Sequence, residues 1–197
     1  MVQATNGDLY GATYGSRTSP DDLGTIFKMS LGGKLTTLHT FNGPDGANPG
    51  GGIVQASNGN FYGTTTQGGS TNPCPSNLFA GCGIIFQLTQ SGKLTTLHSF
   101  RGSDGARPGE GGSLIEGADG SLYGTAADGG SGGPSNQCAR GCGTVFKISS
   151  TGKFTKLYDF CSQTNCSDGA EPAESLVLAT VGVEKLWVSG APLLLTA

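Results

Sequence analysis

The chain has 197 residues, of which 13% are charged, and its formal net charge is −3. A weakly acidic, charge-poor surface gains little Coulombic attraction to phosphate backbones or anionic membranes, so nucleic-acid binding is not expected. No run of eighteen apolar residues is present, so no membrane span is expected either. Short apolar runs separated by many of the 36 glycines predict an all-β protein.

Three short motifs each occur three times, with copies about sixty residues apart, which indicates tandem duplication of one structural unit. Each motif combines glycine with aromatic or β-branched residues, a composition typical of strands and their turns. The copies lie at 9–11, 61–63 and 122–124 for the first motif, 24–28, 83–87 and 143–147 for the second, and 33–41, 92–100 and 152–160 for the third.

The third copy predicts the strands of one unit. Strands are expected at 113–117, 121–125, 144–148 and 153–158, with Asp119-Gly120 providing the tight turn between the first two. A long Gly/Ser/Cys-rich loop separates the second strand from the third. Four short strands in this order form an antiparallel meander, which is one blade of a β-propeller.

The predicted fold is an all-β propeller of four-stranded antiparallel blades, about three and a half per chain, in a single domain over 1–197. The blades are expected at 2–41, 51–100, 111–160 and, incomplete, 173–197. An open stack exposes strand edges and apolar blade faces, so a homodimer that closes the ring is expected. Recurring aromatic rings are expected to pack between blades, namely Phe27, Phe41, Phe86, Phe100, Phe146 and Phe160.

A meander places two sets of loops at opposite rims. The long loops, between the second and third strands and between successive blades, share one rim, which we name the loop face. All arginines and most carboxylates fall in these long loops, and any ligand is expected there. They are Arg17, Arg101, Arg107, Arg140, Asp21, Asp22, Asp45, Asp104, Glu110, Asp128, Asp168, Glu171 and Glu174.

Six cysteines form three close pairs, two of them in equivalent loops. Local pairing predicts disulfides of an exported protein, with a zinc site made of four thiolates as the alternative. No CxxC motif supports zinc. The pairs are Cys74 with Cys82, Cys138 with Cys142, and Cys161 with Cys166.

The repeated segments resemble the GloVer-type tandem repeat of bacterial exported proteins. The resemblance rests on Gly-x-Leu-Tyr-Gly-Thr, Gly-Cys-Gly-Thr-Val-Phe-Lys and Asp-Gly-Ala-x-Pro, and extends from residue 2 to about 180. It implies export, a β-propeller fold and no established catalytic residues. Beyond residue 180 the pattern weakens, and Leu186-Trp187 takes the place of the usual Leu-Tyr.

Asp45, Asp104 and Asp168 each begin an Asp-Gly-Ala-x-Pro segment between blades. The structural interpretation is a turn, in which the carboxylate accepts hydrogen bonds from the following backbone amides and glycine adopts a positive φ. The alternative is a Ca²⁺ site, since carboxylate and carbonyl oxygens suit that ion. Occurrence in every copy favours the turn.

Two further patterns have structural and chemical interpretations. His39 and His98 occupy the position of Tyr158 in the third copy, which favours packing over a catalytic or metal-binding role. Ser131 lies in a segment that formally matches the G-x-S-x-G motif of hydrolases. That motif requires a strand-to-helix turn, and no helix is expected here, so a nucleophilic serine is disfavoured.

Polar residues that break the repeat pattern on the loop face are the binding candidates, namely Arg17, Asp21, Asp22, Arg101, Arg107, Glu110, Asp128 and Arg140. The leading hypothesis is an extracellular or cell-surface scaffold that binds a glycan, a cell-surface component or a protein. The chain opens inside a repeat and shows no signal peptide after Met1.

The alternative is a Ca²⁺-dependent propeller hydrolase or lactonase acting on ester-like or phosphoester bonds. Its catalytic candidates are Glu116, Asp104 and Glu110. First strands line the centre of a propeller, so Gln55 and Glu116 are expected to point into the channel.

Overall fold

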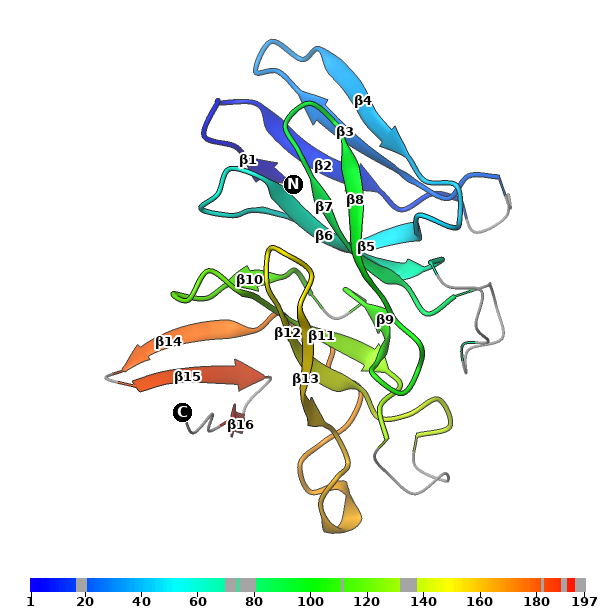
Figure 1. Ribbon diagram of the computed structural model, residues 1–197, viewed down its shortest axis with the longest axis vertical. Helices are drawn as coiled ribbons and strands as arrows, with labels where there is room; N and C mark the ends of the chain where they lie inside the picture. The colour runs from blue at the N-terminus through cyan, green and yellow to red at the C-terminus, as the bar shows by residue number, and fades with distance from the viewer. Residues whose placement is uncertain are drawn as a thin grey trace.

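The computed structural model describes residues 1–16, 21–69, 74, 81–110, 112–131, 138–181, 183–188 and 191–193, with side chains described to residue 178. The described residues form four antiparallel sheets, each built from one copy of the repeat (Figure 1). A single turn of 3₁₀ helix, η1 (Thr164–Cys166), is the one helical element among them. No described helix has the length and apolar character to cross a bilayer.

Neighbouring strands follow chain order in every sheet, apart from one short added strand in the third. The first contains β1 (Val2–Gln3), β2 (Leu9–Thr13), β3 (Thr25–Met29) and β4 (Leu35–Thr40). The second contains β5 (Ala47–Gln55), β6 (Phe61–Gln67), β7 (Ile84–Leu88) and β8 (Leu94–Ser99). The third contains β9 (Ala106–Pro108), β10 (Ile115–Glu116), β11 (Leu122–Asp128), β12 (Thr144–Ile148) and β13 (Phe154–Asp159). The last contains β14 (Val177–Val181), β15 (Val183–Val188) and β16 (Ala191–Leu193).

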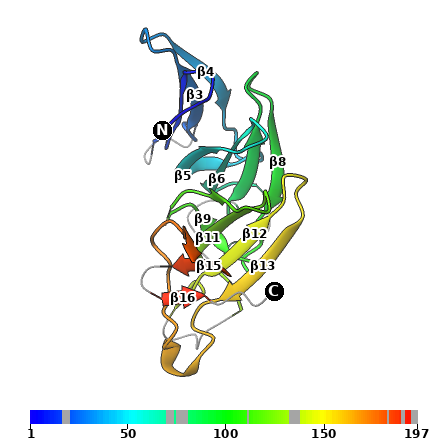
Figure 2. The ribbon, with the colours of Figure 1, turned by 90° about the vertical axis from the view of Figure 1, so that its left-hand side faces the viewer.

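The first three sheets follow one another along the long axis, while the described strands of the last lie beside the third sheet (Figures 1 and 2). The prediction of an all-β chain made of antiparallel four-stranded sheets is confirmed. In the divergent last copy, Trp187 pairs with Val177 as Tyr123 pairs with Ile115, so Leu186-Trp187 does replace the usual Leu-Tyr.

The tight turns form as their residues dictate. Gly7, Gly59 and Gly120 have φ of 87°, 80° and 70°, values that cost glycine no steric energy. The residue before each glycine caps the turn; the carboxylate of Asp119, for example, accepts a hydrogen bond from the amide of Ser121 at 3.0 Å.

The core depends on a cross-strand pair of glycine and phenylalanine. Gly63 faces Phe86 and Gly124 faces Phe146 in the β6–β7 and β11–β12 registers. The ring lies over the glycine so closely that a Cβ on Gly124 would sit 2.7 Å from Cζ of Phe146. Glycine in this strand is therefore required by the ring that covers it.

Aromatic rings of neighbouring sheets complete the core. Phe41 packs on Phe86 with ring centroids 5.7 Å apart, and Phe100 packs on Phe146 at 5.3 Å. All four rings are at most 2% exposed, which confirms that they pack between sheets; each contributes about 1.5–3 kcal/mol by burial. The expectation for Phe27 is only partly met, because no described sheet lies over it and the ring is partly exposed.

The segments between sheets also interlock. Pro108 packs against Gly83, whose Cβ, if present, would lie 2.7 Å from the proline ring; Pro49 with Gly24 and Pro172 with Gly143 repeat this contact. These segments were expected to be turns alone, but Ala106–Pro108 also pairs with β11 as an added strand. This pairing, like that of Ala47 and Pro49 with β6, fixes the inter-sheet loop against the sheet that follows it.

The fourth strand of each complete sheet carries an irregularity that the sequence did not reveal. In β8 the register shifts between Ile85 and Phe86, so Leu97 is an extra residue, and the same shift occurs in β4 and β13. A bulge leaves two successive side chains on one face of the strand. Leu97 consequently packs against the core, next to His98.

Replacing Gly124 by Ala should destabilise the protein by about 1–3 kcal/mol, because the new methyl group overlaps the buried Phe146 ring and overpacks the core. The measurement is the free energy of unfolding in denaturant. Gly32→Ala is the matched control, since the nearest atom to its Cβ would be Oγ of Ser30 at 3.8 Å. Equal stability of the two variants would contradict the role of the glycine–phenylalanine pair.

Candidate functional site

The recurrent aspartates hold the turns between sheets. The carboxylate of Asp104 contacts Nε2 of His98 at 2.9 Å and accepts the amide of Arg101 at 2.8 Å. Asp45 bonds His39 and the amide of Asn42 in the same way. These amides precede the aspartate, whereas the turn predicted from the sequence uses the amides that follow it. Gly46 and Gly105 have φ of 115° and 131°, as a glycine turn requires.

Histidine and tyrosine are interchangeable at this position because both can donate to the same carboxylate. The hydroxyl of Tyr158 donates to Asp168 at 2.7 Å, and the amide of Ser162 donates to it at 3.0 Å. Burial tends to raise the pKa of Asp168, but the hydrogen bonds from Tyr158 and Ser162 lower it overall. Burial likewise tends to raise the pKa of Asp104, but the hydrogen bonds from His98 and the Arg101 amide, with the charge of His98, together lower it.

The residue two places after each aspartate-glycine pair takes a left-handed conformation. Asn48, Arg107 and Glu171 have φ of 55°, 53° and 50°. The amide of Arg107 donates to the carbonyl of Cys82 at 3.0 Å, and the other two bond equivalent carbonyls before the third strand of each sheet. The backbone is therefore the same in every copy, while the side chain that it presents differs in charge.

In the third sheet the residue at this position is Arg107, and its side chain lies in a cluster of charged residues. Nε of Arg107 pairs with Asp128, whose side chain is 2% exposed, and Nη1 of Arg107 pairs with Glu110 at 2.9 Å. Arg140 lies at 4.0 Å from the same Asp128 oxygen. We name Arg107, Glu110, Asp128 and Arg140 the charge cluster. In the second sheet, neutral Asn48 and Gln67 occupy the positions of Arg107 and Asp128.

Charges of both signs stabilise this arrangement. Burial would lower the pKa of Arg107, but the hydrogen bond to Asp128 and the negative charges of Asp128, Glu110 and Glu171 raise it. A buried carboxylate needs such a partner, because leaving the charge unpaired costs about 3–5 kcal/mol. Arg107 and Asp128 form the base of the cluster, while Glu110 and Arg140, each nearly half exposed, form its surface.

Disulfides secure the loop that carries Arg140. The six cysteines form the three predicted pairs, which confirms the disulfide prediction and leaves no thiolate for zinc among them. Sulfur atoms of Cys138, Cys142 and Cys161 lie within 4.8 Å of one another because two disulfides pack together in the core. The carbonyl of Arg140, inside the 138–142 loop, accepts the amide of Gly129 at 2.8 Å.

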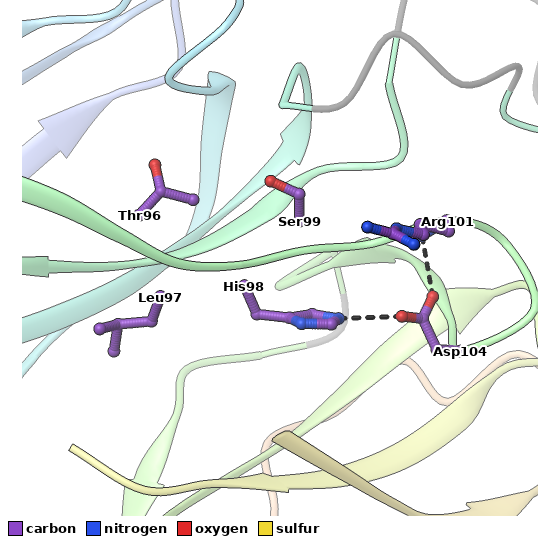
Figure 3. A pocket seen from close by; sticks show the side chains of 6 residues that line it. All are labelled: Thr96, Leu97, His98, Ser99, Arg101 and Asp104. Carbon is purple, nitrogen blue, oxygen red and sulfur yellow. Dashed lines mark hydrogen bonds and ion pairs between the residues drawn. The ribbon is translucent and has the colours of Figure 1, made fainter. Parts of the chain in front are cut away.

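The other binding candidates lie apart from the charge cluster. Arg17 falls outside the described residues, and Asp21 and Asp22 are exposed in the first sheet's long loop. Arg101 lines a shallow pocket of about 420 Å³ along β8. Figure 3 shows Thr96 and Ser99 on one side of the strand and Leu97 and His98 on the other, with Arg101 and Asp104 at the strand's end.

Glu116 joins two sheets at the rim opposite the loop face. Its carboxylate oxygens accept hydrogen bonds from the amide and hydroxyl of Ser57 at 2.8 and 2.7 Å. Gln55 makes the equivalent contact, accepting the amide of Thr5 at 2.9 Å. Glu116 pairs with the first residue of β11 and Asp128 is its last, so about 20 Å of strand separates Glu116 from the charge cluster.

Ser131 has a structural role that its motif did not suggest. Its hydroxyl donates to Asp159 at 2.8 Å, and Lys156 bonds both Asp159 at 2.9 Å and the carbonyl of Ser103 at 3.1 Å. Burial raises the pKa of Asp159, but the bonds from Lys156 and Ser131 lower it overall. The serine hydroxyl thus stabilises a carboxylate and links two loops.

A family model described as the Gloeobacter/Verrucomicrobia repeat matches residues 1–187. The chain belongs to this repeat family. The Gloeobacter/Verrucomicrobia repeat therefore spans the three complete sheets and most of the last, in agreement with the resemblance seen in the sequence motifs. A search of curated proteins found no significant match.

Comparison of the copies of the Gloeobacter/Verrucomicrobia repeat shows which site residues could be predicted from the sequence. Four of the pattern-breaking candidates converge in the charge cluster, but Glu171 was not among them although its charge acts on Arg107. Its alignment with Asn48 and Arg107, after the third Asp-Gly-Ala, was the available signal. The pairing of Lys156 with Asp159 depends on the bulge in β13, which no motif indicates.

Replacing His98 by Tyr should change the free energy of unfolding by less than about 1 kcal/mol, because tyrosine makes the same bond in the third copy. Asp104→Ala should cost about 1–3 kcal/mol, since the Arg101 amide and His98 lose their acceptor. Denaturant unfolding of both variants provides the measurement. A larger loss for His98→Tyr than for Asp104→Ala would contradict this assignment.

Proposed function

We propose that this chain is an extracellular binding module, built as part of a β-propeller, that presents its loop face to a glycan, a cell-surface component or a protein. The observation that supports the proposal most is the charge cluster. It joins the loop before the third sheet to the loop inside that sheet, and it breaks a repeat that is otherwise closely kept.

The cluster has features of a preorganised binding surface. The buried pair of Arg107 and Asp128 fixes the geometry, while Glu110 and Arg140 offer charges of both signs to a ligand. A disulfide closes the short loop around Arg140, so less conformational entropy is lost on binding. Disulfides also persist in oxidising compartments, which supports an extracellular or cell-surface location.

The arrangement of the sheets supports a propeller. Propeller blades are four-stranded meanders that follow one another in chain order, as these sheets do, and 1–197 would then form one domain with blades at the predicted ranges. The first sheet leaves apolar side chains at its outer face, including partly exposed Phe27 and exposed Leu35. We propose that another copy of the chain covers this face.

The contacts between described sheets show what such a copy would provide. A Cβ on Gly92 would lie 3.2 Å from the carbonyl of Leu38 in the preceding sheet, and Gly152 has the same relation to Leu97. Gly33 is the equivalent residue of the first sheet, and a Cβ on Gly33 would have no other atom within 4 Å. The contact that Gly92 and Gly152 make with a preceding sheet is therefore absent at Gly33.

A homodimer should therefore form at micromolar concentration, and Leu35→Glu should weaken it at least tenfold by placing a charge on the apolar face. Sedimentation equilibrium of the purified chain measures both. The control is Lys93→Glu, which changes an exposed turn of the second sheet. A monomer at every concentration would contradict the proposed self-association.

The hydrolase alternative gains no support from the contacts of its candidates. Glu116 is bonded to Ser57 and lies far from Asp104 and Glu110, while Asp104 is bonded to His98 and a backbone amide. Asp45 and Asp168 are engaged in the same way as Asp104, so these carboxylates already have the hydrogen-bond partners that a Ca²⁺ ion would have to displace.

Charge reversal at the surface of the cluster tests the binding function. Arg140→Glu should weaken binding to any extracellular polysaccharide or surface protein that the wild-type chain retains, by at least tenfold, because like charges then face Asp128 and Glu110. Immobilised-ligand arrays followed by titration measure the effect.

Lys93→Glu is the matched control, since this exposed lysine lies in a tight turn on the opposite rim. Unchanged unfolding free energy of both variants shows that the fold persists. Wild-type affinity of Arg140→Glu would overturn the assignment of the cluster.

A further inference from the structure

The second copy of the repeat has a polar row that ends in an arginine, which neither the first nor the third copy has at this position. The bulge at Leu97 places Thr96 and Ser99 on one side of β8, followed by Arg101 at the strand's end (Figure 3). Among the described residues, no hydrogen bond or ion pair engages the hydroxyls of Thr96 and Ser99 or the guanidinium group of Arg101. These donors are free for a ligand.

The equivalent row in the third copy is satisfied internally. Lys156 and Asp159 replace Thr96 and Ser99, and they pair with each other at 2.8 Å and with Ser131. Cys161, in a disulfide, replaces Arg101. In this copy the positive charge is neutralised by the chain itself.

The first copy presents the same row without charge. It carries Thr37, Thr40 and Asn42 at the three positions. Of the three copies whose side chains are described, the second therefore combines small polar residues with an unpaired cation, and a pocket of about 420 Å³ is lined by this row. That volume falls within the range of small-molecule sites, about 300–1,000 Å³.

We infer that this pocket binds an acidic saccharide, with the sugar carboxylate on Arg101 and its hydroxyl groups on Ser99 and Thr96. The inference rests on the proposed binding function and names its ligand class. A guanidinium group binds a planar carboxylate through two parallel hydrogen bonds, which favours a uronic acid.

The neighbouring carboxylate does not compete for Arg101. Asp104 lies at the end of the pocket, where His98 and the Arg101 amide occupy its oxygens at 2.9 and 2.8 Å. The ring of His98 is itself held by stacking on Phe154, with centroids 3.8 Å apart. Asp104 and His98 are thus held by contacts within the chain, whereas the Arg101 guanidinium group has no such contact among the described residues.

The test is a titration of the full chain with oligogalacturonate, followed by amide chemical shifts and calorimetry. Shifts should concentrate at residues 96–104. The methyl-esterified oligomer, which has the same backbone without charge, should bind at least tenfold more weakly. Arg101→Gln should lose at least tenfold in affinity and Ser99→Ala severalfold, while Lys93→Gln, on the opposite rim, should bind as the wild type does.

Several results would overturn the inference. These are wild-type affinity of Arg101→Gln, equal binding of the esterified oligomer, or preference for a sulfated oligosaccharide over the uronate. Binding of other polymers that depends on Arg140 and leaves residues 96–104 unshifted would sink this inference while the proposed function stands. Absence of binding to any extracellular polymer, oligogalacturonate included, would remove both.

Discussion

The packing of a phenylalanine ring over a glycine of the neighbouring strand is the contact on which the rest of the structure depends. The absence of a side chain at Gly63 and Gly124 lets Phe86 and Phe146 lie flat on their own sheets. Each ring then receives one phenylalanine, Phe41 or Phe100, from the sheet before it. Stacking of sheets therefore follows from the internal geometry of each, as expected of repeat proteins whose units cannot bury their apolar faces alone.

A backbone held so closely leaves variation to side chains at fixed positions. Asn48, Arg107 and Glu171 share one left-handed conformation and one backbone hydrogen bond, yet they present a neutral, a positive and a negative group. The copies thus differ in the charge of the side chain at this position, while their backbone conformation there stays the same. The charge cluster and the polar row on β8 are both products of this arrangement, since each uses positions that other copies fill with neutral or self-paired residues.

Much of the fold was predictable from the sequence, because glycine and aromatic residues recur at every turn and core position. The turn at Gly120 and the rings of Phe86 and Phe146 follow directly from the repeat. The bulge at Leu97 was not predictable, since it changes register without a residue of special conformation. The polar row on β8 was not predictable for the same reason. In a regular strand without the bulge, Thr96 and Ser99 would lie on opposite faces and would form no row.

The contact of Glu116 with Ser57 has a counterpart in Gln55 with Thr5, and both partners change together at the next boundary, where Leu178 and Ala118 occupy the positions. The first two boundaries are therefore joined by polar contacts, whereas the same positions at the third hold apolar residues. Copies of the repeat are not interchangeable parts: exchanging their order would set Leu178 opposite Ser57, or the Glu116 carboxylate opposite an alanine methyl group. The order of the first three copies thus matters to the hydrogen bonds that join their sheets, from Ser57 to Glu116 and from Thr5 to Gln55.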